Sequence, residues 1–517
     1  MRRWPPLVLI VALLVGALVV DHERARDQAA AVPSAPDPAG LLPVGLPDDA
    51  LGSIWFCAGQ TAGDDTRADG TVVVANLGPD DASGRIEVVG DDGERASQAL
   101  EVAAASTERV RLADVLTADW VAARVELDRG HVVVEHEVAG PEGRDVAACH
   151  NRADDTWYLP SGATTRDARM TVAIYNPYAD EDVVDLSFVT GEGQRRPRDL
   201  QDLPIPARSV VAVDVTSVVT VREILATTVS ARRGRVVVDR IQTYDGRGAS
   251  ATEEEAAAEA YRRTGLTVTP AVPRPRPVWR FPAGVKSPGI HERVVVFNPG
   301  RDEAEVEITV SLDDPRRNGR PEPFPLTVAG GDFEVFDLDA APEVPPEVRH
   351  SLLVRTVSGP GVIAERSIDA EGAATYVGVA TSTGSPVAAR RWAFAAGPRP
   401  DGAEAARMVV MNPGSEEVDV RLVAFGDGRR AAVRGGGPFR LGPGDRREIV
   451  VETLLDDRGS VEVLASGPIV AERRLIASET APDESSDESS DADAEPQPGM
   501  GASTTLGIPL GTVTVLG

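Results

Sequence analysis

This sequence has few of the residues on which catalytic, metal-binding and nucleic-acid-binding proteins rely. Its 517 residues include 2 cysteines and 6 histidines, and its single lysine is Lys286. It contains no HExxH, CxxC or EF-hand spacing, no GxSxG elbow and no P-loop. The net charge of −28 argues against nucleic acid as a partner, because nothing would neutralise its phosphates. We therefore expect no enzyme, no cofactor and no metal site.

Aromatic residues are also scarce, at 4% of the chain, whereas glycine and proline are common, with 49 and 40 copies. This composition favours many short strands joined by turns over long helices. We interpret the acidic charge as a solvated exterior.

The N-terminus carries an uninterrupted apolar run from Trp4 to Val20, preceded by two arginines and ended by Asp21. A run of this length lies at the short limit for a transmembrane helix and at the long limit for a signal-peptide core. Basic residues before the run place the N-terminus in the cytoplasm and the bulk of the chain outside. Residues 1–20 thus predict a single-pass signal anchor in the cell membrane, with cleavage and secretion as the alternative. Residues 21–50 predict a flexible stalk.

Three short motifs then recur four times in the same order. The first is a tryptophan followed within five residues by glycine, at Trp55, Trp157, Trp279 and Trp392. The second is a β-branched run that ends in asparagine, at Asn76, Asn176, Asn298 and Asn412. The third is an apolar triplet followed by an acid and then a base, at Glu135-His136, Asp239-Arg240, Glu365-Arg366 and Glu472-Arg473. Tryptophan precedes asparagine by 21, 19, 19 and 20 residues, which indicates an internal repeat.

Strand-like stretches with turn signals about every ten residues fill the space between these motifs. They predict a mainly β chain of four tandem antiparallel β-sandwiches of the immunoglobulin or fibronectin type. We expect the repeats at 51–153, 154–273, 274–387 and 388–517, with an acidic disordered loop at 479–502. Repeats of this length favour separate domains, arranged like beads on a string, over propeller blades.

Each motif has a structural interpretation. The four tryptophans are expected to anchor the four cores, with stacking on sugar rings as the alternative. The asparagines are expected to start turns, because their side chains can bond the backbone two residues on. Adjacent residues on a strand point to opposite faces, so an acid and its neighbouring base cannot line one site. We expect one of them to be solvated while the other meets a charge on a neighbouring strand, with a repeated ligand role as the alternative.

The two cysteines, Cys57 and Cys149, lie in the predicted first and last strands of the first repeat. Outside the cytoplasm, a lone pair of this kind predicts a disulfide. It would connect the two ends of the repeat.

The WxxxxG…NP…ER pattern behind an apolar N-terminus, in an acidic chain that is poor in lysine, resembles an actinobacterial family of membrane-anchored envelope proteins of unknown function. The resemblance covers residues 51–515 and implies a location and an architecture, but no activity. The first repeat departs from the pattern, with His136 in place of arginine and Leu77 in place of proline.

Together these features predict a non-enzymatic structural or interaction protein of the cell envelope. Its partners would be the membrane, through the N-terminal helix, and cell-wall glycan or envelope proteins. A multivalent polysaccharide-binding protein and an envelope hydrolase are the alternatives.

Overall fold

The computed structural model of the chain describes residues 40–47, 49–63, 67–250, 252, 254–255, 259, 261–313, 321–371, 376–397, 404–451, 459–477 and 499–516. The described part is mainly β, as the sequence predicts, and its strands form several sheets. The predicted anchor, most of the stalk and most of the acidic loop lie outside the described residues. Among the described residues, no helix has the length and apolar character needed to cross a lipid bilayer.

The second repeat shows the plan of each copy most clearly. One of its sheets has the order β14-β10-β16-β17, and the other contains β12, β11, β15 and β9, with β13 paired to β11. Buried and half-buried residues alternate along most of β11, so that one face of the sheet turns inward. Trp157, Ile174 and Leu186 come from both sheets and share one buried core. The elements are β9 (Thr156–Leu159), β10 (Ala168–Asn176), β11 (Asp182–Thr190), β12 (Gly193–Arg195), η3 (Arg198–Leu200), β13 (Leu203–Ile205), β14 (Ser209–Asp214), α2 (Val215–Val218), β15 (Leu225–Arg233), β16 (Val237–Asp245) and β17 (Thr264–Pro270).

The first and third repeats follow the same plan, although in the first a parallel pairing of Thr61 with Asp69 joins the two sheets. The first contains β1 (Ser53–Ala62), β2 (Asp69–Asn76), β3 (Ala82–Gly90), β4 (Arg95–Val102), β5 (Ser106–Arg111), η2 (Leu112–Asp114), β6 (Ala118–Leu127), β7 (Val132–Gly140) and β8 (Gly143–Ala148). The third contains β18 (Val278–Lys286), β19 (Ile290–Asn298), β20 (Ala304–Leu312), β21 (Phe324–Val328), β22 (Asp332–Asp337), β23 (Val348–Ser358), β24 (Ile363–Ala370) and β25 (Tyr376–Thr383).

In the fourth repeat one long strand, β32, pairs with strands of both sheet types. This repeat contains β26 (Val387–Phe394), β27 (Glu404–Met411), β28 (Val418–Gly426), β29 (Arg429–Ala432), β30 (Phe439–Leu441), β31 (Arg446–Val451), β32 (Ser460–Ala477), β34 (Ala502–Leu506), β35 (Ile508–Pro509) and β36 (Val513–Val515). The short β33 (Gly499–Met500) instead runs parallel to β25 of the third repeat.

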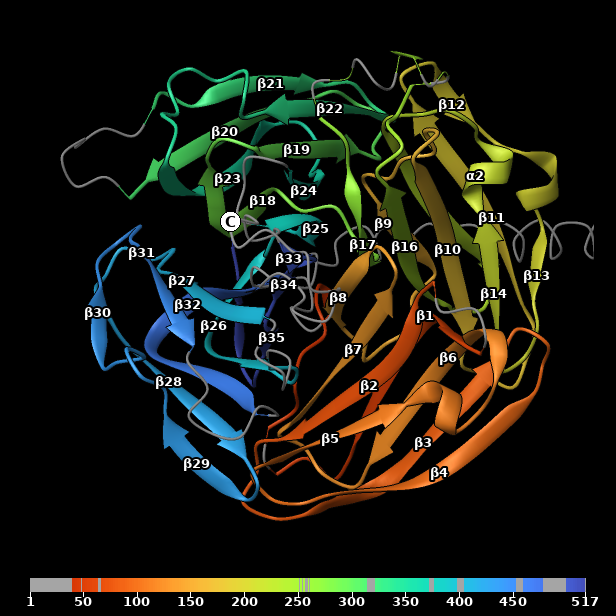
Figure 1. The fold of residues 1–517 in the computed structure, drawn as a ribbon, viewed down its shortest axis with the longest axis vertical. Coiled ribbons are helices and arrows are strands. Elements are labelled where there is room, and N and C mark those ends of the chain that lie inside the picture. Colours follow the sequence, from red (N-terminus) through yellow and green to blue (C-terminus); the bar gives the residue numbers. More distant parts are fainter. Residues whose placement is uncertain are drawn as a thin grey trace, which may run out of the picture.

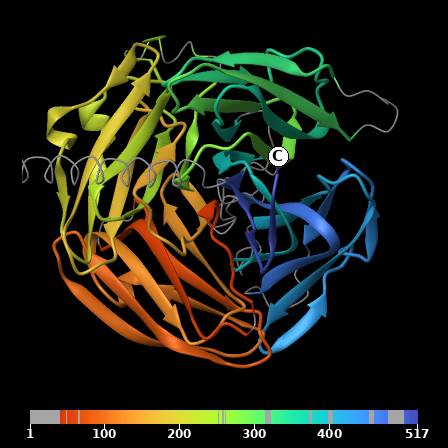
Figure 2. The same cartoon turned by 180° about the vertical axis from the view of Figure 1, so that it is seen from behind.

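The four repeats form a closed ring, shown from its two sides in Figures 1 and 2. The tryptophan strand of one repeat packs against the asparagine or acid–base strand of the next, as β1 does on β10 and β16, and β18 on β27 and β32. The same arrangement closes the ring where β26 meets β7. This is a head-to-tail contact whose rotation closes after four copies. The expectation of separate domains on a string is therefore wrong, because each repeat buries a surface on both of its neighbours.

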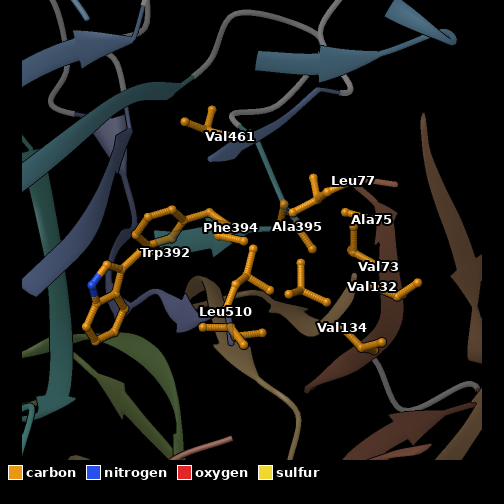
Figure 3. Close-up of a cluster of buried hydrophobic side chains, with 14 of the residues drawn as sticks. Val73, Ala75, Leu77, Val132, Val134, Trp392, Phe394, Ala395, Val461 and Leu510 are labelled. Carbon is orange, nitrogen blue, oxygen red and sulfur yellow. The ribbon is translucent and has the colours of Figure 1, made fainter. Parts of the chain in front are cut away.

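The fourth and first repeats share one continuous hydrophobic core across the closing contact. Figure 3 shows Trp392, Phe394 and Leu510 of the fourth repeat beside Val73 and Val134 of the first. The two ends of the described chain add to this contact, since Gly45 pairs in parallel with Leu510. We call this contact the closing seam.

Candidate functional site

The four repeated tryptophans lie in the cores and are at most 1% exposed. Three of them donate their indole N–H to a backbone carbonyl of the same repeat: Trp157 to Val236 at 2.7 Å, Trp279 to Val362 at 2.7 Å and Trp392 to Ile469 at 2.8 Å. The indole N–H of Trp55 has no partner within the described residues. Because all four rings are covered, none presents a face on which a sugar could stack.

The four repeated asparagines make the same turn in every copy. In the fourth repeat, Asn412 Oδ1 accepts the backbone N–H of Gly414 at 2.9 Å, two residues on. Its Nδ2 donates to the carbonyls of Glu416 at 2.7 Å and Leu441 at 3.0 Å. The equivalent bonds are made by Asn76, Asn176 and Asn298. Each asparagine thus shapes its turn and attaches it to a neighbouring segment.

The acid–base motif joins neighbouring repeats. Arg240 of the second repeat donates to Glu365 of the third at 2.7 Å, and Arg366 of the third donates to Glu472 of the fourth at 2.6 Å. At the closing seam, Arg473 of the fourth repeat donates to Glu135 of the first at 2.9 Å. The base of each repeat therefore reaches forward to the acid of the next. We call these contacts the ring links.

Each acid also accepts a bond from the repeat that precedes it in the ring, close to that repeat's tryptophan. The backbone N–H of Ala283 donates to Glu472 at 2.9 Å, and that of Ala396 donates to Glu135 at 2.7 Å. The hydroxyl of Ser161 donates the equivalent hydrogen bond to Glu365. The tryptophan–glycine motif and the acid–base motif are therefore two halves of one interface.

The prediction that one member of each acid–base pair is solvated is wrong. Glu365 and Arg366 are each 1% exposed. Their side chains do point to opposite sides of the strand, but in a ring both sides face protein. The acid faces the preceding repeat and the base faces the following one. Bonds of this kind add little net stability over apolar packing, but they can fix which surfaces pair.

The link between the first and second repeats uses histidine instead of arginine. Asp239 of the second repeat accepts from the backbone N–H of Ala58 at 3.0 Å and bonds His150 Nε2 at 2.9 Å. His136, at the position of the other repeats' arginines, lies 3.7 Å from the same carboxylate. Complete burial lowers the pKa of His136 below its usual 6.5, and the nearby Asp239 opposes this effect only in part.

The predicted disulfide is confirmed, since Cys57 and Cys149 are bonded in the structure. Each cysteine directly precedes one of the groups that hold Asp239, namely Ala58 and His150. The disulfide therefore connects the two ends of the first repeat at the contact where the regular arginine link is missing.

The strands β8, β17, β25 and β34 lie at the centre of the ring, and each packs against two of the others. Asp145 on β8 accepts the backbone N–H of Val268 on β17 at 2.7 Å. Burial raises the pKa of Asp145 to about 7, although its hydrogen bonds oppose the shift. A pocket at this centre has a cavity volume of only about 70 Å³, beside Gly40–Pro43.

A glycine lies at the same position in three of the central strands and directly before the fourth, β34, and none of the three repeated motifs contains it. Every one of these glycines lies five residues before the residue paired with the acid of the link. A Cβ atom added to Gly265 would lie 2.6 Å from the backbone nitrogen of Val379 in the next repeat, and one on Gly378 would lie 2.8 Å from that of Ala502. Gly143 and Gly501 have φ angles of 141° and 126°, which side chains disfavour.

The carboxylates of the acid–base motif take part in contacts between repeats. Every acid of the ring links is bonded to groups of a neighbouring repeat. No cluster of three or more histidine, cysteine, aspartate or glutamate side chains within the described ranges could hold a metal ion.

The fold and the ring links together define this protein as a closed ring of four β repeats joined head to tail by buried bonds. The chain belongs to a family of unknown function, DUF5719, whose sequence model matches residues 48–276, 129–345 and 275–507. Each match spans about two repeats. No curated protein matches the sequence.

Solved structures give only distant similarities. A Thermotoga maritima structure, 1070, is 19% identical, with a TM-score of 0.19 over 22% of this chain and 95% of that one. The Anabaena sensory rhodopsin transducer is 20% identical, with a TM-score of 0.16 over 18% of this chain and 83% of that one. A tetra-tandem repeat from the extending region of a large adhesion protein is 9% identical, with a TM-score of 0.10 over 90% and 99% of the two chains.

Proposed function

We propose that the chain is a non-enzymatic structural or interaction protein of the cell envelope, attached to the membrane by residues 1–20. Its ring of four repeats, each a sandwich of the immunoglobulin or fibronectin type, is exposed outside the cell. There it serves as a rigid platform for other envelope components.

The observation that carries this proposal is the use of the repeated residues. The recurring tryptophans and asparagines stabilise the core and a turn of each repeat, and the acid–base pairs join neighbouring repeats, so all three motifs serve the architecture. A glycoside hydrolase would need two carboxylates that face each other across a substrate site. The repeated carboxylates face the backbone and the bases of neighbouring repeats instead.

The disulfide supports the location. Disulfides persist in oxidising compartments outside the cytoplasm, and Cys57 and Cys149 account for all the cysteine in the chain. An extracellular ring is consistent with this bond and with the basic residues before the apolar run.

The test is fractionation of cells that express the full chain, combined with labelling by a thiol reagent that cannot cross membranes. We expect the chain in the membrane fraction, cleaved by protease added to intact spheroplasts, and unreactive toward the reagent until it is reduced. Cross-linking in the same cells should join it to envelope components. A chain found in the cytoplasm with two free thiols would refute the proposal.

A further inference from the structure

A pocket with a distinctive lining lies at the seam between the first and second repeats. Its cavity volume is about 210 Å³. Drug-sized ligands usually occupy roughly 300–1,000 Å³, so this pocket suits a smaller molecule, of about one sugar ring. The polar groups that line it are Arg67, Trp120, Arg169, Thr171, Asp214 and Thr243.

The pocket begins where the apolar contact between the two repeats ends. On β10, Ala173 and Tyr175 are buried against the first repeat. Arg169 and Thr171 continue the same face of the strand, because residues two apart point the same way. Thr243 pairs with Arg169, and Asp214 pairs with Thr171, on the two neighbouring strands. The sheet thus places four polar side chains beside the seam, next to Ala212 and Ile241 of the same lining.

The first repeat contributes Trp120 to the lining, the only tryptophan of the described chain that stands outside the repeated motif. It lies five residues before Val125, the residue that pairs with Trp55. The residues at this position in the second and third repeats are Ile224 and Arg349, by the same count from the partners of Trp157 and Trp279. Trp120 is partly exposed, unlike the four repeated tryptophans.

The chemistry of these groups matches a sugar that carries an acid. An indole face packs well on the C–H face of a pyranose ring, and threonine hydroxyls bond ring hydroxyls. Arg169 brings a guanidinium group to the pocket lining, and arginine binds carboxylates in a two-pronged geometry. One carboxylate oxygen of Asp214 accepts a hydrogen bond from the backbone N–H of Thr216, at 3.0 Å.

We propose that this pocket is a binding site for a uronic-acid unit of an acidic polysaccharide. Trp120 supplies the stacking surface, Arg169 binds the sugar carboxylate, and Asp214 and the two threonines bond the hydroxyls. We expect it at this seam alone among the described repeats, because Ile224 and Arg349 stand at the position of Trp120 in the second and third repeats. It adds a ligand to the proposed platform and does not depend on where the chain is located.

The probes are methyl β-D-glucuronide and its neutral counterpart, methyl β-D-glucoside, titrated into the full-length chain in detergent. Binding is followed by tryptophan fluorescence and by saturation-transfer NMR. We expect saturable binding of the glucuronide and at least tenfold weaker binding of the glucoside. Trp120→Ala should weaken glucuronide binding at least tenfold, and Arg169→Gln should abolish the preference for the acidic sugar.

The matched control is Arg198→Gln, which removes an exposed arginine of the second repeat outside the pocket lining. It should bind both sugars as the unaltered chain does, and thermal melts should show that all three variants are folded. No saturable binding of the glucuronide, or equal binding by folded Trp120→Ala, would overturn the site. Equal binding of the two sugars would overturn the assignment to an acidic sugar.

Discussion

The ring link at the closing seam is the contact whose removal should weaken the protein most clearly. Arg473→Met removes the base of this link but keeps most of its apolar stem. Glu135 then retains the bond from Ala396 and loses its charged partner, at a place where neither side chain of the pair is exposed. Removing one member of a buried ion pair costs about 3–5 kcal/mol, because the remaining charge stays in a poorly solvating environment. We expect a loss of that size in the free energy of unfolding.

The assay is urea-induced unfolding followed by circular dichroism, with Arg440→Met as the control. Arg440 also pairs with a glutamate, but its side chain is 71% exposed, so its loss should have little measurable effect. The double variant Arg473→Met with Glu135→Leu should be more stable than Arg473→Met alone, because no charge is left unpaired. Equal unfolding curves for Arg473→Met and Arg440→Met would refute the reasoning.

Three further predictions concern the centre of the ring and the first repeat. Gly265→Ala should lower the free energy of unfolding by about 1–3 kcal/mol through its clash with the next repeat, whereas Gly191→Ala, which meets nothing within 4 Å, should not; denaturant titration compares the two. Reduction of the Cys57–Cys149 disulfide, which joins residues 92 apart, should cost about 4–5 kcal/mol, measured by unfolding with and without reductant; equal midpoints would contradict this. Because the pKa of His136 is lower in the folded chain than its usual 6.5, the unfolded chain binds the proton more readily, and stability should fall as the pH drops below 6.5. His136→Gln should reduce this pH dependence in unfolding curves measured from pH 7.5 to 5, and an unchanged dependence would show that other groups cause it.

Much of the local structure could be predicted from the sequence, because the same short motifs occur four times. The strand-rich fold follows from β-branched runs and closely spaced turn signals, which act over a few residues. The Asn412 turn follows from the ability of asparagine to bond the backbone two residues on. The Cys57–Cys149 disulfide follows from its position at the two ends of one repeat.

The ring itself could not be predicted, since it depends on contacts between residues far apart in sequence. Glu135 and Arg473 are separated by 338 positions, and nothing in either motif indicates that they meet. The acid and the base of each pair do point to opposite sides of their strand. Neither is solvated, because the ring places protein on both sides of that strand.

The central glycines were hidden by loops of unequal length. They follow the acids of the four links by 8, 26, 13 and 29 residues, so a search for fixed spacing passes over them. Counting backward along the central strand of each repeat, from the residue paired with the acid, places all four at one position. Trp120 belongs to none of the repeated motifs, so the recurrence of those motifs gives no indication of its role.

Closure of the ring is tested most directly by the distance between the first and fourth repeats at the closing seam. The backbone N–H of Gly428 donates to Ser106 Oγ at 2.9 Å, so Ser106 and Asp427 lie close together although they belong to different repeats. Spin labels can be attached through Ser106→Cys and Asp427→Cys, because the native cysteines are already bonded to each other. A closed ring predicts strong dipolar broadening from a single short distance within one chain. Labels that are far apart, with a broad spread of distances, would show that the repeats are joined only by their linkers.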